Sequence, residues 1–64
     1  MMKVKCLNNL NDETWEFRNG KHYIYDEMYG YVVGDNFKPV YCYIDDERVI
    51  AAIKNRLIFE TVEG

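Results

Sequence analysis

Several features that mark larger or specialised proteins are scarce in this sequence. The four glycines stand singly, so no Gly-rich phosphate-binding loop is present. Long apolar runs are missing, and polar residues follow position 7 at once, so we expect neither a signal peptide nor a membrane span. With 64 residues the chain has room for one core, and we expect a single domain over residues 1–64.

Cysteine and histidine are also rare, being limited to Cys6, Cys42 and His22. Zinc sites normally pair two ligands at short spacing, and none of the three has such a neighbour. A nucleophilic pair of His22 with either cysteine lacks any local nucleophile motif. We therefore expect no metal, no cofactor and no enzymatic activity. Both thiols are expected to be reduced, with a Cys6–Cys42 disulfide as the alternative.

Basic residues are in deficit. The chain has 8 Lys and Arg against 11 Asp and Glu, which gives a net charge of −3. Proteins that bind nucleic acid usually present a basic surface that releases counterions. This charge balance disfavours nucleic acid as the partner.

Most of the chain shows the patterns of short β-strands separated by polar turns. The predicted strands cover residues 2–7, 15–17, 22–25, 31–33, 40–44 and 57–62. In the first of them Met2, Val4 and Cys6 share one face, as a half-buried strand requires. The Asn19–Gly20 pair predicts a tight hairpin between residues 15–17 and 22–25.

One segment has the spacing of a helix instead. Its apolar residues recur three and four positions apart, at Val49, Ile50, Ile53 and Leu57. Acidic residues at 45–47 suit the start of a helix and basic residues suit its end, which predicts a helix over residues 46–55. The expected fold class is mainly β (α+β): an antiparallel meander of five or six short strands curled into a small barrel, with the helix before the last strand.

Four segments carry a resemblance to a known group of proteins: residues 3–9 (KVKCLNN), 17–23 (FRNGKHY), 31–33 (YVV) and 59–62 (FETV). The chain resembles small bacteriophage and prophage proteins of the SH3-like barrel type. The resemblance implies a phage-encoded accessory protein that acts on a host component in the bacterial cytoplasm. It departs from that group at the predicted helix, where those proteins have a short turn.

Tyrosine, in contrast, is abundant in this sequence. In each of the segments 22–25 and 40–44, two tyrosines alternate with apolar residues and therefore share one face of the strand. The apolar residues are the better candidates for the core, namely Ile24, Cys42 and Ile44. The tyrosines expected on the outer face are Tyr23, Tyr25, Tyr41 and Tyr43.

Exposed tyrosines offer a large contact area with a polar tip and are enriched at interaction hot spots. An alternative is that aromatic pairs across strands only stabilise the sheet. We expect a non-enzymatic module that binds and modulates or inhibits a bacterial host protein. The residues predicted to contact the partner are Tyr23, Tyr25, Tyr31, Tyr41, Tyr43, Asp45, Asp46 and Glu47.

Three other functions remain open from the sequence. A small barrel binds single-stranded nucleic acid when aromatic residues stack on bases beside a basic strip. The basic strip available here is Lys3, Lys5, Arg18, Lys21 and Lys38. Alternatively, the acidic residues imitate DNA phosphates, or a homodimer covers the aromatic face and stabilises so short a chain.

Overall fold

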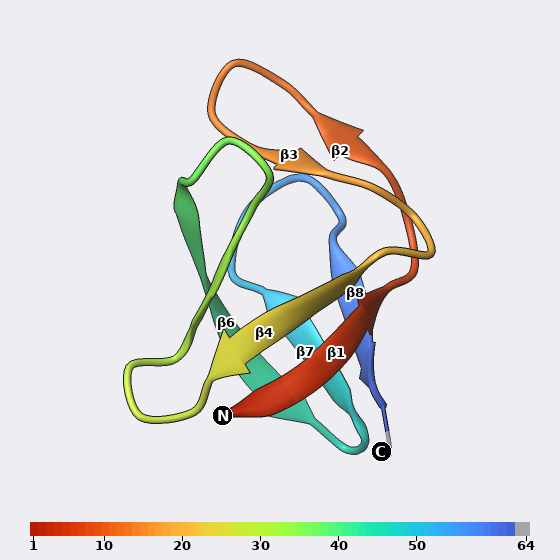
Figure 1. Cartoon of the computed structure of the whole chain (residues 1–64), viewed down its shortest axis with the longest axis vertical. Helices are drawn as coiled ribbons and strands as arrows, with labels where there is room; N and C mark the ends of the chain where they lie inside the picture. The colour runs from red at the N-terminus through yellow and green to blue at the C-terminus, as the bar shows by residue number, and fades with distance from the viewer. Residues whose placement is uncertain (63–64) are drawn as a thin grey trace.

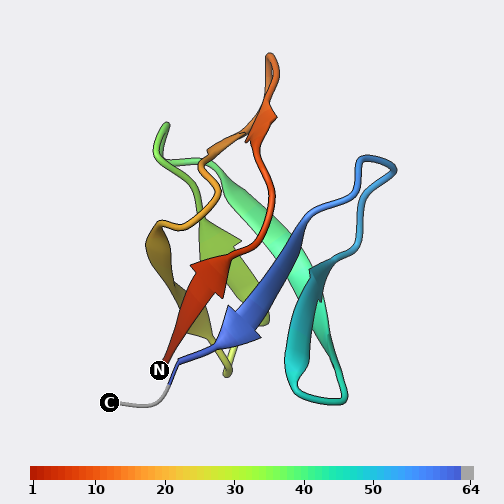
Figure 2. The same cartoon turned by 90° about the vertical axis from the view of Figure 1, so that its right-hand side faces the viewer.

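Eight β-strands build the fold within residues 1–62, the part of the chain that the structure, a computed structural model, describes (Figures 1 and 2). Six of them close into an antiparallel barrel in the order β1–β4–β5–β6–β7–β8, with β8 returning to pair with β1. The barrel strands are β1 (Met2–Cys6), β4 (His22–Asp26), β5 (Tyr31–Val33), β6 (Pro39–Asp45), β7 (Arg48–Ala51) and β8 (Ile58–Thr61). The prediction of a small antiparallel barrel is therefore confirmed.

The first strand has the alternation that its sequence predicts. Val4 and Cys6 are fully buried inside the barrel, and Lys3 points outward. Because β1 pairs with both β4 and β8, its inward residues meet side chains from both neighbours. The register places Val4 opposite Tyr23 and Cys6 opposite Phe59, which starts the core.

The predicted hairpin around Asn19–Gly20 is wrong in its pairing. The turn itself forms, since Gly20 has φ 88° and the Lys21 amide donates to the Arg18 carbonyl over 3.2 Å. Its two flanks then separate: β3 (Glu16–Phe17) pairs with β2 (Leu10–Asn11) as a small second sheet, while β4 pairs with β1. The turn is held instead by the end of β1, where the Gly20 amide donates to the Cys6 carbonyl over 2.7 Å.

The predicted helix over residues 46–55 is also wrong. Residues 39–51 form a β-hairpin in which Asp45 lies opposite Arg48. The two residues between them make the turn, and Asp46 adopts φ 61°, the left-handed conformation that Asp tolerates better than most residues. Val49 faces inward opposite Phe59 of β8, so pairing on both sides of β7 outweighs the local helix preference. Within residues 1–62 no helix has the length and apolar character to cross a bilayer.

The core is centred on three aromatic rings. Phe17 contacts Tyr23 and Phe59 edge to face, with centroids 5.1 and 5.6 Å apart, and Tyr23 meets Phe59 at 6.1 Å. Phe17 thus anchors the small sheet of β2 and β3 onto one end of the barrel (Figure 1). Each such edge-to-face pair contributes about 0.5–1.5 kcal/mol to stability in addition to the contribution of the apolar area that it buries.

A close approach of backbone to backbone fixes the loop between β5 and β6 at that same end. Gly34 is buried, and a Cβ at this position would lie 2.8 Å from the Glu16 carbonyl oxygen and 3.1 Å from the Phe17 ring. The Asp35 amide accordingly donates to the Glu16 carbonyl over 2.8 Å. Only glycine lets the loop come this close to β3.

Candidate binding face

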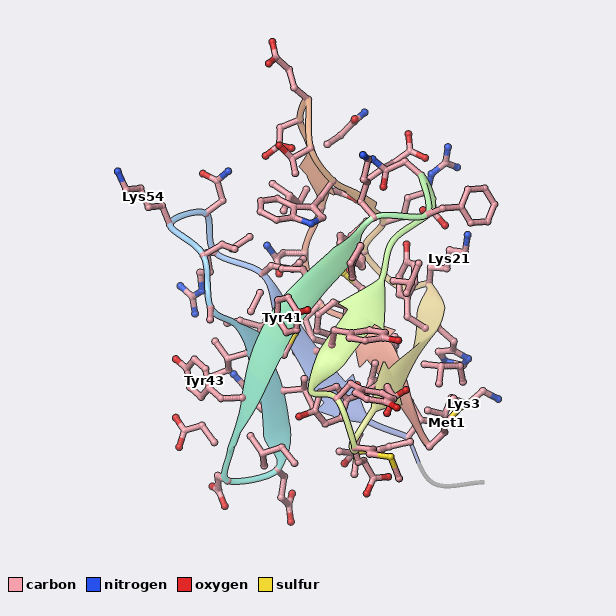
Figure 3. The ribbon with its side chains drawn as sticks, turned by 90° about the vertical axis from the view of Figure 1, so that its left-hand side faces the viewer. Met1, Lys3, Lys21, Tyr41, Tyr43 and Lys54 are labelled. Atoms are coloured by element: carbon pink, nitrogen blue, oxygen red, sulfur yellow. The ribbon has the colours of Figure 1, made fainter. Side chains whose placement is uncertain are left out.

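The exposed large apolar side chains of the barrel concentrate on the outer side of β4, β5 and β6, the side that faces the viewer in Figure 3. We call this surface the aromatic face, and it comprises Ile24, Tyr29, Tyr31, Val33, Tyr41 and Tyr43. Tyr29, Tyr41 and Tyr43 are 65%, 63% and 52% exposed. Contiguous apolar surface of this kind on a small domain marks an interaction site more often than single exposed residues do.

The tyrosines of this face contact one another in a defined geometry. Tyr31 lies directly opposite Tyr41 across β5 and β6, and the two rings meet edge to face at 6.0 Å. On its other side Tyr31 stacks with Tyr29 at 6.1 Å and an interplanar angle of 13°. Mutual packing restricts the rotamers of these rings, so little entropy remains to be lost when a partner binds them.

Two adjoining hollows lie at the edge of the face. The Val33 hollow, about 400 Å³, is lined by Met1, Ile24, Asp26, Tyr31 and Val33. The Met28 hollow, about 410 Å³, is lined by Met1, Asp26, Glu27, Met28 and Tyr29. Both sizes fall in the range that receives side chains or small ligands. Asp26 and Met1 belong to both hollows and lie between them.

The structure brings together three of the five predicted tyrosines. Tyr31, Tyr41 and Tyr43 lie on the outer face as expected, with Tyr41 and Tyr43 side by side along β6 (Figure 3). The placement of Tyr23 and Tyr25 on this surface is wrong, because both are buried inside the barrel. Neither of these two contributes to a contact surface.

Two of the three residues that were predicted to lie in the core are exposed. Ile24 lies between the two inward tyrosines of β4 and is 50% exposed, so it belongs to the aromatic face instead. Ile44 is also exposed, because it lies close to the turn at the end of β6. Cys42 packs against the core, as predicted. The difference on β4 follows from the Tyr23 hydroxyl, which reaches polar partners from inside the barrel.

The three predicted acidic contacts do not cap a helix but surround the hairpin turn. Asp45, Asp46 and Glu47 are all exposed there. The turn that follows β4, with Asp26 and Glu27, lies at the same end of the barrel (Figures 1 and 2). Carboxylates from two turns therefore gather at one end of the molecule, beyond the end of the aromatic face.

No protein-family model, curated protein or solved structure matches the chain. Charged side chains line part of the outer surface of the other strands. Across β1, β8, β7 and β6 the register aligns one outward row of alternating charge: Lys5, Glu60, Arg48 and Asp45. This row is well suited to water, whereas the neighbouring outward row on the same strands, formed by Tyr43, Ile50 and Ile58, is apolar, with both isoleucines only partly exposed.

A polar cluster at the other end of the barrel holds the structure together. The Tyr23 hydroxyl accepts the Arg18 amide over 2.9 Å and donates to Asp35 over 2.8 Å, and Asp35 also pairs with Lys21. The bond to Lys21, together with that from Tyr23, lowers the pKa of the Asp35 carboxyl. Burial, followed by the carboxylate of Asp35, raises the pKa of Tyr23 to about 12. These groups satisfy one another and leave Tyr23 no role as an acid or base near pH 7.

The thiols and the histidine lie on different faces of the sheet. Cys6 is inside the barrel, where its thiol donates to the Asn8 carbonyl over 2.9 Å, and burial raises its pKa. Burial likewise raises the pKa of Cys42 to about 12. His22 is exposed on β4. Among residues 1–62, no three His, Cys, Asp or Glu side chains are grouped so as to hold a metal ion.

Sequence reasoning missed part of the face. Ile24 and Val33 were not expected on it, and Asp26, Glu27 and Met28 were assigned only to a turn. One signal was available for Met28 and Tyr29: two large apolar side chains in a turn are unusual, because turn residues are mostly small or polar.

Proposed function

We propose that this chain is a small non-enzymatic binding module that docks another protein on its aromatic face. The observation that carries the proposal is the set of mutually packed tyrosines Tyr29, Tyr31 and Tyr41, in which Tyr29 and Tyr41 are largely exposed and Tyr31 is partly buried between them. Tyrosine supplies large contact area at low entropic cost and recurs among the residues that dominate binding energy. A barrel without free sheet edges supports such a face rigidly.

The biological setting that we propose follows the resemblance to phage and prophage proteins of the SH3-like type. The module is then a phage-encoded accessory protein in the cytoplasm of the bacterial host, where it modulates or inhibits a host protein.

The experiment is a capture from bacterial lysate by the immobilised protein, read by mass spectrometry. We expect one dominant protein, and we expect its capture to be lost with Tyr41→Ala/Tyr43→Ala. Both side chains are more than half exposed, so this variant should stay folded, which its circular dichroism spectrum checks.

The matched control is Phe37→Asn, which removes an 87% exposed aromatic side chain from the loop between β5 and β6 and outside the aromatic face. Asn also accepts the φ of 64° found at this position. Capture should persist with the control. Equal capture by a folded double tyrosine variant, or loss only with Phe37→Asn, would place the contact surface elsewhere and refute the proposal.

Nucleic acid is not the partner that we propose. Of the five residues in the predicted basic strip, Lys21 is paired with Asp35, and Lys3 lies opposite Ile24 at the β1 side of the aromatic face, whose hollows are lined by Asp26 and Glu27. Carboxylates beside a stacking surface repel phosphates. Fluorescence anisotropy with an oligothymidine at low salt should show no binding, and a salt-dependent signal would favour the nucleic-acid alternative.

A further inference from the structure

We propose that the aromatic face receives a basic segment of its protein partner, with an apolar side chain in the Val33 hollow and an arginine in the Met28 hollow. This inference rests on the proposed function and specifies the chemistry of the partner. It follows from the lining of the two hollows and from the charges around them.

The Val33 hollow suits an apolar side chain. Ile24 and Val33, from the adjacent strands β4 and β5, line it together with Tyr31 and Met1. Ile24 is half exposed here, so an aliphatic side chain placed against it would remove apolar surface of both partners from water. Each buried methylene contributes about 0.8 kcal/mol to such a contact.

The Met28 hollow suits a long cation. Met28 and Tyr29 are among its lining residues, and the side chains of both are largely exposed. These groups pack well against the aliphatic stem and the planar head of an arginine. Asp26 and Glu27 line the same hollow and supply the negative charge. Arginine fits better than lysine, because its planar head both stacks on a ring and binds carboxylates in a bidentate manner.

Basic groups also lie on this side of the barrel, namely the Met1 amine and, on β1, Lys3 opposite Ile24. Lys3 forms no ion pair with Asp26 or Glu27 within residues 1–62, so both carboxylates are available to a ligand. One oxygen of Asp26 accepts the amides of Met28 and Tyr29 over 3.0 and 3.2 Å, which shapes the turn and leaves its second oxygen for a ligand. Glu27 lies 3.8 Å from the amine of Met1, and both groups are more than half exposed. An exposed pair at that distance contributes little, so an arginine can replace it.

A second copy of the chain is a poorer occupant of the same face. In a two-fold symmetric dimer each surface patch meets the same patch of the other copy. A second copy would bring only the same side chains to the contact, and the aromatic face itself carries no arginine to enter the Met28 hollow, while each copy adds its own Asp26 and Glu27 to the interface. Like charges across an interface cost several kcal/mol in the worst case. A basic partner complements this surface, whereas the chain itself does not.

The test is a titration of the isotope-labelled protein with three acetylated, amidated hexapeptides, followed by NMR. They contain three repeats of Leu-Arg, Leu-Gln or Leu-Glu. We expect the Leu-Arg peptide to shift amide signals of residues 24–33 and to bind about tenfold more tightly than the Leu-Gln peptide. The Leu-Glu peptide should not bind. Added salt should weaken the Leu-Arg complex alone.

Charge variants sharpen the test. Asp26→Asn/Glu27→Gln keeps the amide-accepting oxygen of the turn and removes both charges, so it should reduce Leu-Arg affinity about tenfold and leave Leu-Gln affinity unchanged. The matched control is Glu13→Gln/Glu60→Gln, which removes two exposed carboxylates from the β2–β3 loop and from β8, outside both hollows. We expect less than about a twofold change in Leu-Arg affinity with this control, because exposed charges outside the hollow are screened.

The outcomes separate this inference from the proposed function. Equal affinities of the Leu-Arg and Leu-Gln peptides for the face would overturn the basic preference and leave the binding function intact. The inference also fails if no peptide binds while lysate capture still depends on Tyr41 and Tyr43. Peptide binding that is insensitive to Asp26→Asn/Glu27→Gln would overturn the assignment of the arginine to the Met28 hollow. Lysate capture that ignores the tyrosines refutes the proposed function itself.

Discussion

The phenol of Tyr23 donates a hydrogen bond to the carboxylate of Asp35 over 2.8 Å and thereby links β4 to the loop between β5 and β6. The same hydroxyl accepts the Arg18 amide over 2.9 Å, so it also fixes the turn that leads into β4. Tyr23 is therefore a structural residue, in contrast to the exposed tyrosines on β6. This division between inner and outer tyrosines separates variants that should affect stability from those that should affect binding.

Removing the Tyr23 hydroxyl should lower stability. Tyr23→Phe leaves the Arg18 amide and one oxygen of Asp35 without their partner, and we expect a loss of about 1–2 kcal/mol in the free energy of unfolding. Urea denaturation measures it. The control Tyr41→Phe removes a hydroxyl that has no such bonds in the described residues and should change stability by less than about 0.5 kcal/mol. Equal losses in the two variants would contradict the structural role of Tyr23.

Acid should unfold the domain partly through Asp35. The pKa of this carboxyl is lowered by its bonds to Lys21 and Tyr23. Its contribution to stability is present above the unfolded pKa of about 3.9 and is lost as the pH falls from there through the lower folded pKa. Asp35→Asn should therefore flatten the decline in urea midpoint below about pH 4. Asp12, whose pKa is lowered by the amides of Trp15 and Thr14, accounts for part of what remains.

Gly34 should tolerate no side chain. A Cβ would stand 2.8 Å from the Glu16 carbonyl and 3.1 Å from the Phe17 ring, so Gly34→Ala must separate the β5–β6 loop from β3. We expect a loss of about 1–3 kcal/mol, the usual cost of overpacking, measured by urea denaturation. Lys38→Ala, in an exposed position of the same loop, serves as the control and should be near neutral. Unchanged stability of Gly34→Ala would contradict the close approach.

The turn of the β6–β7 hairpin should respond oppositely to glycine at its two positions. Asp46→Gly relieves a non-glycine residue at φ 61° and should stabilise the protein by about 0.5–1 kcal/mol. Glu47 is not at positive φ, so Glu47→Gly gives no relief of strain in the folded protein. It raises the conformational entropy of the unfolded chain and should therefore destabilise the protein. Thermal unfolding of both variants gives the comparison. Destabilisation by both substitutions, as a helix would predict, contradicts the hairpin.

The cysteines should be nearly inert in the folded protein. Burial raises the pKa of both thiols, that of Cys42 to about 12. Since the thiolate is the reactive form, a disulfide reagent at pH 8 should label the native protein at least about 100-fold more slowly than the denatured protein. Rapid labelling of either cysteine in the native state would show that its part of the barrel opens readily.

The fold was predictable from alternating patterns wherever one face of a strand meets the core and the other meets water. Lys3 and Lys5 around Val4 are the clearest case. The same rule identified which residues of β4 share a face but not which face is inside. That choice depends on partners distant in sequence, namely the bonds of Tyr23 to Arg18 and Asp35 and the packing of Ile24 beside Val33.

The missing helix has a related cause. Val49, Ile50 and Leu57 have helical spacing, but Val49 and Ala51 also alternate as a strand does, and the pairing of β7 with β6 and β8 decides between the two. A turn formed by Asp46 and Glu47 lacks the Asn-Gly signal that identifies most tight hairpins. On β6 the assumption that apolar residues face inward was right for Cys42, which packs against the core, so Tyr41 and Tyr43 lie on the outer face as predicted.

The central claim is that a partner protein contacts the aromatic face, and site-specific photo-crosslinking tests it most directly. A benzophenone amino acid replaces Tyr41, Tyr43 or, as the control outside the aromatic face, Phe37. After illumination in bacterial lysate, we expect one covalent adduct of the same partner from positions 41 and 43 and none from position 37. An adduct from position 37 alone, with none from the tyrosine positions, would contradict the account.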